Sequence, residues 1–260
     1  MLTWNVDPEL IVIGPIHIRW YGFLFSLGFL ASFFVLAWIF RKENKTVEQL
    51  NKLYIYLIIA VVIGARLGHC LFYRPEYYLA HPLEILKVWQ GGLASHGAAA
   101  GIIIALLVYA RQTAGMSFLW LADRVALLVP LGASFVRVGN FFNSEILGLP
   151  SRKPWAVVFV RVDAIPRHPV QLYEAITYLL IFIIMIILYR RHLGATPGRL
   201  TGAMLIMLFS MRFILEFFKS VQSTLDSSLP ITMGQLLSLP LIAFGLWLVT
   251  RKGPVLAQDQ

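Results

Sequence analysis

The chain contains a single cysteine, Cys70, among its 260 residues. One cysteine excludes an internal disulfide, a CxxC redox pair and a cysteine-rich metal site. Charged residues are also scarce: they form 13% of the sequence, whereas a soluble domain usually carries about 25%. Hydrophobic residues make up 58%, and the mean hydropathy is +0.74. Most of the chain is therefore expected to lie in lipid.

Several catalytic and binding motifs are absent. The sequence has no H-E-x-x-H, and no two histidines lie three or four positions apart, so we expect no intramembrane zinc site. Ser134 lies in "GASFV", which lacks the second glycine of a nucleophile elbow, and no phosphate-cradling glycine loop is present. The net charge of +9 is spread over short loops rather than gathered in a basic stripe. We therefore predict no metal, no cofactor and no nucleic-acid partner.

The sequence does contain about seven apolar segments close to the roughly 20 residues that span a bilayer. They run near 17–40, 53–73, 93–110, 117–138, 170–189, 200–219 and 232–250. We predict an all-α polytopic membrane protein of about seven transmembrane helices, with residues 1–260 forming a single integral membrane domain. The first run is long enough to span and lacks the basic flank and cleavage site of a signal peptide, so we expect it to be retained.

Basic residues between the segments predict the orientation of the helices. The flanks on one side hold ten Lys and Arg residues, whereas the N-terminus, 74–92 and 219–231 on the other side together hold three. The long connection 140–169 holds four more, Arg152, Lys153, Arg161 and Arg167, but long loops obey the rule less strictly. The N-terminus is therefore predicted outside and the C-terminus in the cytoplasm. The connection 140–169 is predicted outside, between the fourth and fifth helices. It is too apolar and too rich in proline for a disordered linker, and "WAVVFV" favours a short strand, so we expect a small extracytoplasmic cap.

Polar residues cluster in the predicted outer halves of the segments. They are Arg66, His69, His96, Arg137, Asn140, Gln171, Tyr173, Glu174, Arg212 and Glu216. Ionisable residues within spans usually face an interior cavity and mark function. Several arginines beside a histidine, amides and carboxylates suit an anionic headgroup, because guanidinium groups match phosphate bidentately.

Structural roles are open for the same residues. Arg212 and Glu216 are spaced i, i+4 and can simply pair, while Asn140 and Asn143 can cap helix ends or hold the cap. His96 lies in "LASHGAAAG", a small-residue stretch suited to close helix packing. Arg66 can snorkel to the membrane interface.

The stretch "VRVGNFFNSEILG" (136–148) resembles the signature of bacterial prolipoprotein diacylglyceryl transferases, G-R-x-G-N-F-x-N-x-E-x-x-G. Further motifs follow in the family's order: "IRWYGFLFSLGF", "GARLGHCLFY", "GGLASHG", "HPVQLYE", "PGRLTG", "RFILEFF" and "MGQLLSLP". The resemblance covers nearly the whole chain. Val136 replaces the glycine before the signature arginine, Ser144 replaces a glycine that is common after Asn143, and Leu208 stands where the family often has tyrosine.

The resemblance implies transfer of the diacylglyceryl group of phosphatidylglycerol to the lipobox cysteine of a prolipoprotein. The products are a thioether-linked precursor and glycerol-1-phosphate, in the first step of bacterial lipoprotein maturation. The enzyme would be a multi-pass protein of the bacterial inner membrane and would need no cysteine of its own, because the substrate supplies the thiol.

The resemblance also implies roles for particular residues. His96 is the expected base, and Arg137 and Arg212 are expected to stabilise the leaving phosphate. The expected substrate-binding residues are Arg137, Asn140, Asn143, Glu145, Gly148, Tyr21, Arg66 and Glu216. Two other functions stay open: a transporter of anionic lipid that performs no chemistry, and a non-catalytic scaffold that binds lipoprotein precursors.

Overall fold

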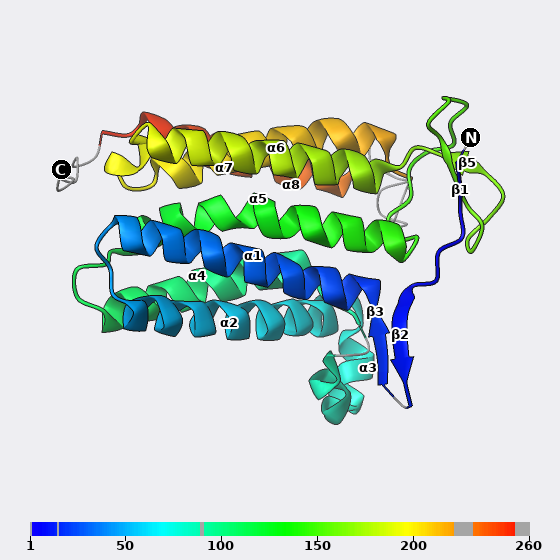
Figure 1. Ribbon diagram of the computed structural model, residues 1–260, viewed down its shortest axis with the longest axis horizontal. Helices are drawn as coiled ribbons and strands as arrows, with labels where there is room; N and C mark the ends of the chain where they lie inside the picture. Colours follow the sequence, from blue (N-terminus) through cyan, green and yellow to red (C-terminus); the bar gives the residue numbers. More distant parts are fainter. Residues whose placement is uncertain (1, 15, 89–90, 221–230, 253–260) are drawn as a thin grey trace. The chain divides into compact units, whose positions relative to one another are not determined.

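The computed structural model describes residues 2–14, 16–88, 91–220 and 231–252 (Figure 1). The chain forms two compact units, one of residues 1–34 together with 123–260 and one of residues 35–122. The boundaries fall inside two helices, after Phe34 and before Asp123.

The first unit contains the helices that carry most of the predicted site. They are α1 (Trp20–Lys42, up to Phe34), α5 (Phe118–Phe142, from Asp123), α6 (Val170–Arg190), α7 (Arg199–Leu215) and α8 (Met233–Thr250), with the 3-10 helices η3 (Leu193–Ala195) and η4 (Glu216–Phe218). Its strands are β1 (Leu2–Trp4), β2 (Glu9–Ile13), β3 (Ile16–Arg19), β4 (Val157–Phe159) and β5 (Pro166–Arg167).

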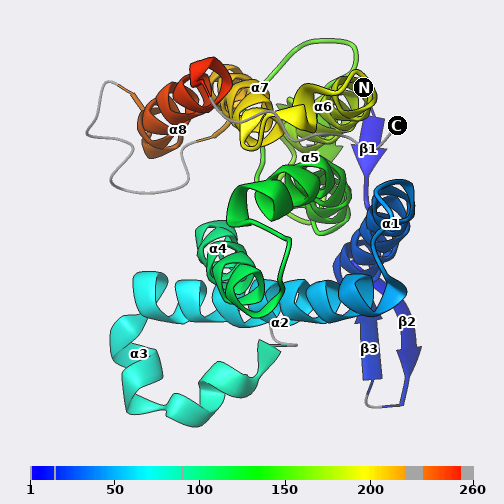
Figure 2. The ribbon, with the colours of Figure 1, turned by 90° about the vertical axis from the view of Figure 1, so that its left-hand side faces the viewer.

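The second unit is built around two helices that approach closely. It contains the rest of α1, α2 (Val47–Tyr73), α3 (Pro75–Ala80), η1 (Pro82–Leu86) and α4 (Ser95–Gln112). Figure 2 shows α3 and η1 turning away from the end of α2. A Cβ atom on Gly97 of α4 would overlap the carbonyl oxygen of Gly64 on α2, and one on Gly68 would lie 2.7 Å from the Cα atom of Gly97. The close packing expected of the small-residue stretch around His96 is confirmed.

Each of the seven predicted apolar segments contains a long helix. Six helices in the described part of the chain, α1, α2, α5, α6, α7 with η4, and α8, are long and apolar enough to cross a membrane. The remaining predicted segment corresponds to α4, which has 18 residues and is not among these six. The chain is thus a helical, multi-pass membrane protein.

Local sequence explains where the helix ends differ from those expected. Residues 16–19 pair as strand β3, so α1 begins at Trp20 and not near residue 17. Thr46 and Gln49 form a capping box that starts α2 at Val47, several residues earlier than hydropathy indicated. Helix α5 continues to Phe142 and so includes residues 137–140 in its last turns.

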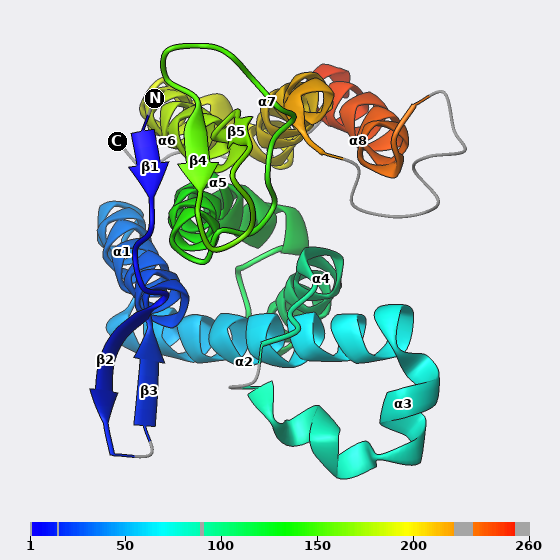
Figure 3. The ribbon, with the colours of Figure 1, turned by 90° about the vertical axis from the view of Figure 1, so that its right-hand side faces the viewer.

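Short strands lie at the end of the first unit where α5 ends and α6 begins. Strands β1, β4 and β5 form a sheet in that order, with β1 parallel to β4 and β5 antiparallel to it (Figure 3). The strand expected in "WAVVFV" is confirmed as β4. Phe141, Val157 and Phe159 form a buried cluster that holds the sheet against the end of α5.

At the opposite end of the same unit, a buried carboxylate fixes the start of α7. Asp123 accepts hydrogen bonds from the backbone N–H groups of Gly198 (2.7 Å) and Thr201 (2.8 Å) and from the Thr201 hydroxyl (2.7 Å). Because the first N–H groups of a helix have no partner within the helix, Asp123 satisfies donors that would otherwise be unpaired in lipid.

Candidate active site

Arg137, on the last turns of α5, is held by an acid and an amide. Its Nε atom lies 3.0 Å from Oε2 of Glu174 on α6, and its Nη1 donates to Oδ1 of Asn140 (3.1 Å). The Glu174 side chain is completely buried, and that of Arg137 is 14% exposed. A buried carboxylate is costly unless it is paired, so this contact fixes the direction of the guanidinium group.

Lys219 continues the network from the segment after η4. Its Nζ lies 2.8 Å from Oε1 of Glu174 and 3.2 Å from Oε2 of Glu216, and its side chain is 6% exposed. The Tyr178 hydroxyl donates to the same Glu174 oxygen at 3.4 Å. Arg137, Glu174, Lys219 and Glu216 thus form an ion-pair chain in which positive and negative groups alternate.

Arg212 carries a charge that this ion-pair chain does not balance. The sequence allows it to pair with Glu216 one turn later, but Glu216 pairs with Lys219 instead. In the described part of the chain Arg212 forms no ion pair. Its charge acts on the Tyr178 phenol, which also borders Glu174 and Arg137. A guanidinium group beside the ion-pair chain is therefore available to an anionic ligand.

Glu145 is positioned by the two asparagines of the signature. Nδ2 of Asn140 donates to its Oε2 (3.0 Å), and Nδ2 of Asn143 donates to its Oε1 (3.2 Å). Gln171 of α6 donates to the Glu145 backbone carbonyl at 2.6 Å. Asn140 therefore links Arg137 to Glu145 and lies inside α5 rather than capping it. Asn143 lies directly after α5, and its bond to Glu145 fits the alternative that it holds the cap loop.

The loop that carries Glu145 has an unusual backbone. Ser144 and Ile146, on either side of it, both have φ of +55°. This left-handed region costs little for glycine and is rare for a β-branched residue such as isoleucine. Ser144 therefore adopts a conformation that glycine would adopt without strain.

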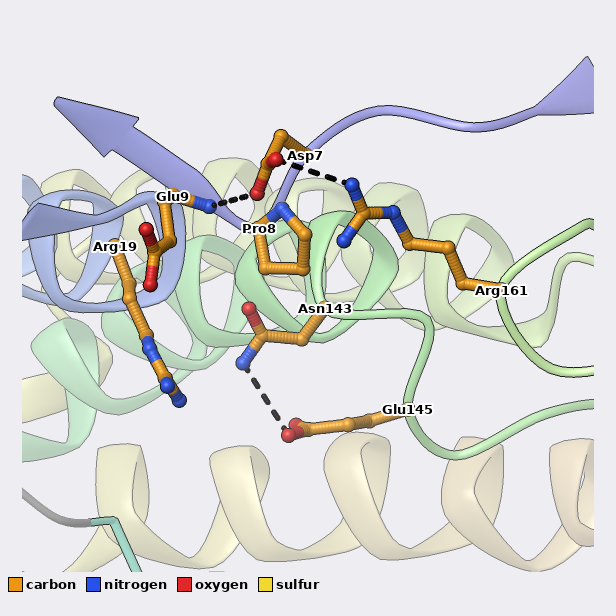
Figure 4. Close-up of a pocket in the computed structure, with 7 residues that line it drawn as sticks. All are labelled: Asp7, Pro8, Glu9, Arg19, Asn143, Glu145 and Arg161. Atoms are coloured by element: carbon orange, nitrogen blue, oxygen red, sulfur yellow. Dashed lines mark hydrogen bonds and ion pairs between the residues drawn. The ribbon is translucent and has the colours of Figure 1, made fainter. Parts of the chain in front are cut away.

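A pocket of 410 Å³ lies beside this loop (Figure 4). It is lined by Asp7, Pro8, Glu9, Arg19, Asn143, Glu145 and Arg161. Asn143 brings a buried Oδ1 atom that has no hydrogen-bond partner among the described residues. The mixture of acids, arginines and an amide suits a polar ligand with both donors and acceptors.

Two carboxylates outside the long apolar helices, those of Asp7 and Asp163, are held in the charged form. The backbone N–H of Glu9 donates to Asp7 (2.9 Å) and, with Arg161 (3.1 Å), keeps the pKa of Asp7 below its ordinary value. Hydrogen bonds from Arg167 and from the N–H of Ile165 lower the pKa of Asp163 in the same way. Both acids therefore stay ionised across the physiological pH range.

Two expected binding residues contribute through close packing. A Cβ on Gly139 would lie 2.9 Å from the Tyr21 ring of α1, so this glycine lets α1 approach α5 and brings Tyr21 beside the signature. A Cβ on Gly148 would overlap the carbonyl oxygen of His168. The Gly148 carbonyl accepts from the Ser220 hydroxyl (2.7 Å), which ties the loop to the segment after η4.

Two further expected residues, His96 and Arg66, belong to the second unit. His96 is exposed at the start of α4, where its ring contacts Phe72 and Tyr73 at centroid distances of 5.0 and 5.9 Å. Its catalytic role stays a prediction.

Arg66 is buried, and its guanidinium group is fully engaged. It donates to the backbone carbonyls of Glu84 (2.7 Å), Ile85 (3.0 Å) and Gly91 (2.6 Å). This arrangement favours anchorage of η1 and of Gly91 over snorkelling to an interface.

The sequence identified Arg137, Asn140, Glu145 and Glu174 as polar residues near one membrane boundary, and the structure joins them in one network. Lys219 was counted only as a loop charge. Its spacing of three residues from Glu216 was the available signal. Asp7 and Arg161 were also missed, because residues far apart in sequence meet only through the strands.

Comparison with known proteins assigns the family. The family model described as prolipoprotein diacylglyceryl transferase matches residues 8–251. The phosphatidylglycerol–prolipoprotein diacylglyceryl transferase of Tolumonas auensis is 48% identical over 249 residues, covering 96% of each chain. The proteins of the same name from Chloroherpeton thalassium and Bacteroides fragilis are 48% and 39% identical, and each alignment covers 95% of this chain and 93% of the relative. The network around Arg137 is thus the signature region of a matched family, and the chain belongs to the prolipoprotein diacylglyceryl transferases.

Proposed function

We propose that the chain transfers the diacylglyceryl group of phosphatidylglycerol to the lipobox cysteine of prolipoproteins. The observation that carries this proposal is the arginine pair of the first unit. Arg137 is fixed by Glu174, while Arg212 is left without an ion-pair partner in the described chain. A phosphodiester supplies the missing negative charge. The names of the relatives supply the substrate class.

The chemistry needs stabilisation of a leaving phosphate. The substrate thiolate attacks the glycerol carbon bonded to the phosphate oxygen, a carbon–sulfur bond forms, and the carbon–oxygen bond breaks. The phosphate departs with the headgroup glycerol as glycerol-1-phosphate. Guanidinium groups aimed at this phosphate stabilise the charge that grows on it, and losing one such donor typically costs on the order of 10²–10³ in rate.

The thiol also needs help to ionise. A free cysteine has a pKa of about 8.5 and is only a few per cent thiolate near neutrality. We assign His96 as the base that accepts the thiol proton. His96→Gln should then lower the rate more at acidic than at alkaline pH, where the thiol ionises unaided. An equal loss at every pH would indicate a positioning role.

Phosphate binding by the arginines predicts a ranking of variants. Arg137→Lys keeps the charge but loses the planar two-pronged donor, so it should bind phosphatidylglycerol yet transfer slowly. Arg137→Ala and Arg212→Gln should be essentially inactive. Asn140, Asn143, Glu145 and Tyr21 would orient the headgroup glycerol or the arginines.

The decisive assay is incubation of the purified chain with phosphatidylglycerol and a lipobox peptide, read by mass spectrometry. We expect the peptide to gain a diacylglyceryl group and glycerol-1-phosphate to appear in equal amount. Arg111→Gln, at the far end of α4 from His96, serves as the matched control and should keep full activity. Lipid movement without a covalent product would indicate a transporter. Peptide binding without any diacylglyceryl product, and unchanged in folded Arg137→Ala, would indicate a scaffold.

The proposal includes a topology. All seven predicted segments, α4 among them, would span the bacterial inner membrane, with the N-terminus and the cap 140–169 outside and the C-terminus in the cytoplasm. The basic asymmetry of ten residues against three supports this orientation. A reporter fused after Gln260 should report cytoplasm, and one inserted near Lys153 should report the external side. A cytoplasmic signal from the reporter near Lys153 would overturn this orientation.

A further inference from the structure

The hairpin of β2 and β3 has two chemically different faces. Its register pairs Ile11 with Ile18 and Val12 with His17, after a bulge between Glu9 and Ile11. Successive side chains of a strand point to opposite faces. Ile11, Ile13 and Ile18 therefore share one face, which we call the isoleucine face.

The opposite face carries the polar residues Glu9, His17 and Arg19 together with Val12. Glu9 pairs with Arg19 in the register, and a Glu9 carboxylate oxygen lies 3.1 Å from Nδ1 of His17. Glu9 and Arg19 also line the pocket beside Asn143 and Glu145, where Figure 4 shows both side chains. At the pocket this face therefore borders the rest of the first unit, whereas Val12 and His17 on the same face are exposed.

The isoleucine face is left uncovered. Ile13 is 61% exposed, Ile11 49% and Ile18 38%. Large exposed apolar groups gathered on one face usually mark a contact surface. A two-stranded hairpin alone is also only marginally stable in water, so a partner that covers this face would stabilise it.

Position in the fold identifies the partner. Strand β3 ends at Arg19, and the membrane-spanning helix α1 begins at the next residue, Trp20. Figures 1 and 3 show the hairpin running across the axis of α1 at that end. A ribbon perpendicular to a spanning helix lies in the plane of the membrane surface. Trp20, stacked on Phe142 at 4.6 Å, is the residue type that favours the membrane boundary.

We propose that the isoleucine face rests on the lipid leaflet at this end of α1, at the boundary between headgroups and acyl chains. Both strands of the hairpin have open edges in the described chain. Unpaired N–H and C=O groups are not tolerated in the hydrocarbon, so the ribbon lies at the interface and does not insert deeply. The membrane surface then fixes the distance of the polar face from the lipid, and so keeps Glu9 and Arg19 at the pocket.

Single labelled cysteines test this arrangement without measuring activity. The native Cys70 is completely buried, so the unsubstituted chain gives the labelling background. Ile13→Cys and Val12→Cys are adjacent in sequence and lie on opposite faces. Ile18→Cys and His17→Cys form a second matched pair. Each full-length variant is labelled with a small fluorophore and reconstituted in vesicles of phosphatidylglycerol and phosphatidylethanolamine, with the melting temperature measured to verify folding.

Quenching by nitroxide-bearing lipids is then compared with quenching by aqueous iodide. We expect the ratio of lipid to iodide quenching to be severalfold higher at positions 13 and 18 than at 12 and 17. Equal iodide access at all four positions would overturn the proposal. Shielding of positions 13 and 18 from both quenchers would also overturn the proposal. If that shielding disappeared when the protein was diluted in lipid, the face would be covered by a second copy of the chain. If the shielding required added peptide, the face would be covered by the protein substrate. The result is independent of whether the chain transfers lipid.

Discussion

Glu174 lies between two cations: its Oε2 is 3.0 Å from Nε of Arg137, and its Oε1 is 2.8 Å from Nζ of Lys219. The carboxylate comes from α6, whereas its partners come from α5 and from the segment after η4. One buried acid therefore fixes three segments of the first unit and gives the signature arginine its direction.

Replacing Glu174 with glutamine should disrupt this junction. The amide keeps the shape but leaves two buried cations without their shared counter-ion, and removing one partner of a buried pair typically costs about 3–5 kcal/mol. We expect a clear fall in melting temperature and loss of transferase activity. Glu76→Gln, on the exposed helix α3, is the matched control and should change neither. A folded, fully active Glu174→Gln would mean that Arg137 is oriented by Asn140 alone.

Lys219 should be required as a cation. Lys219→Met retains much of the aliphatic stem but leaves Glu174 and Glu216 facing each other without the charge between them. We expect lower thermal stability and at least a tenfold loss of turnover, corresponding to about 1.4 kcal/mol. Lys219→Arg should recover most of both properties. If the methionine variant matched the unsubstituted chain, the ion pairs of Lys219 would contribute nothing measurable.

Arg66 should control the order of residues 82–88, where it holds the carbonyls of Glu84 and Ile85. Its hydrogen bonds to four backbone carbonyls, those of Glu84, Ile85, Gly91 and Gly92, would be lost in Arg66→Gln, and the carbonyls of Glu84 and Gly91 would lose a charged donor. We expect trypsin to cleave faster after Lys87, measured by mass spectrometry of the fragments. Glu76→Gln again serves as the control. Unchanged cleavage at Lys87, with phosphatidylglycerol binding weakened, would favour the headgroup role implied by the family resemblance.

Much of the architecture could be predicted from the sequence because lipid imposes a simple rule. A spanning helix must be apolar for about 20 residues, so hydropathy located the central part of each long helix. The short elements were harder. Strands β1 to β3 lie in the first 19 residues, and β1 gains its partner β4 from more than 150 positions away. No periodicity over three residues can predict such pairing.

The site was predicted as a set of residues but not as a network. Polar residues in the outer halves of several predicted segments, Arg137 and Glu174 among them, indicated a polar site, because such groups are costly in lipid. Which acid pairs with which cation depends on how α5, α6 and the end of α7 pack. Glu216 could be expected to pair with Arg212 from helix spacing. The turn from α7 into η4 instead presents it to Lys219.

The packing of α2 against α4 should be intolerant of a single methyl group. Gly97→Ala would place a Cβ against the backbone of Gly64, which cannot move as a flexible side chain can. We expect the helices to separate, with a lower melting temperature and reduced yield of folded protein. Gly22→Ala, where no atom lies within 4 Å of the added Cβ, is the matched control and should be neutral. Equal stability of the two variants would show that α2 and α4 can shift without cost.

The strained loop around Glu145 should respond in opposite directions to a smaller and a bulkier residue at position 144. Ser144 has φ of +55°, and its buried hydroxyl has no hydrogen-bond partner in the described chain. A left-handed conformation costs an L-residue roughly 1–2 kcal/mol, whereas the added freedom of glycine in the unfolded chain costs about 0.5–1 kcal/mol. Ser144→Gly should therefore leave the melting temperature equal or slightly higher, with activity retained. Ser144→Val adds a β-branched side chain at a positive φ, so it should lower both stability and turnover by displacing Glu145 from Asn140.

Ser151→Gly, in the same connection but without a positive φ, should bring no gain. If Ser144→Val were as stable and active as the serine form, the backbone at position 144 would be relaxed, and the position of Glu145 would not depend on it.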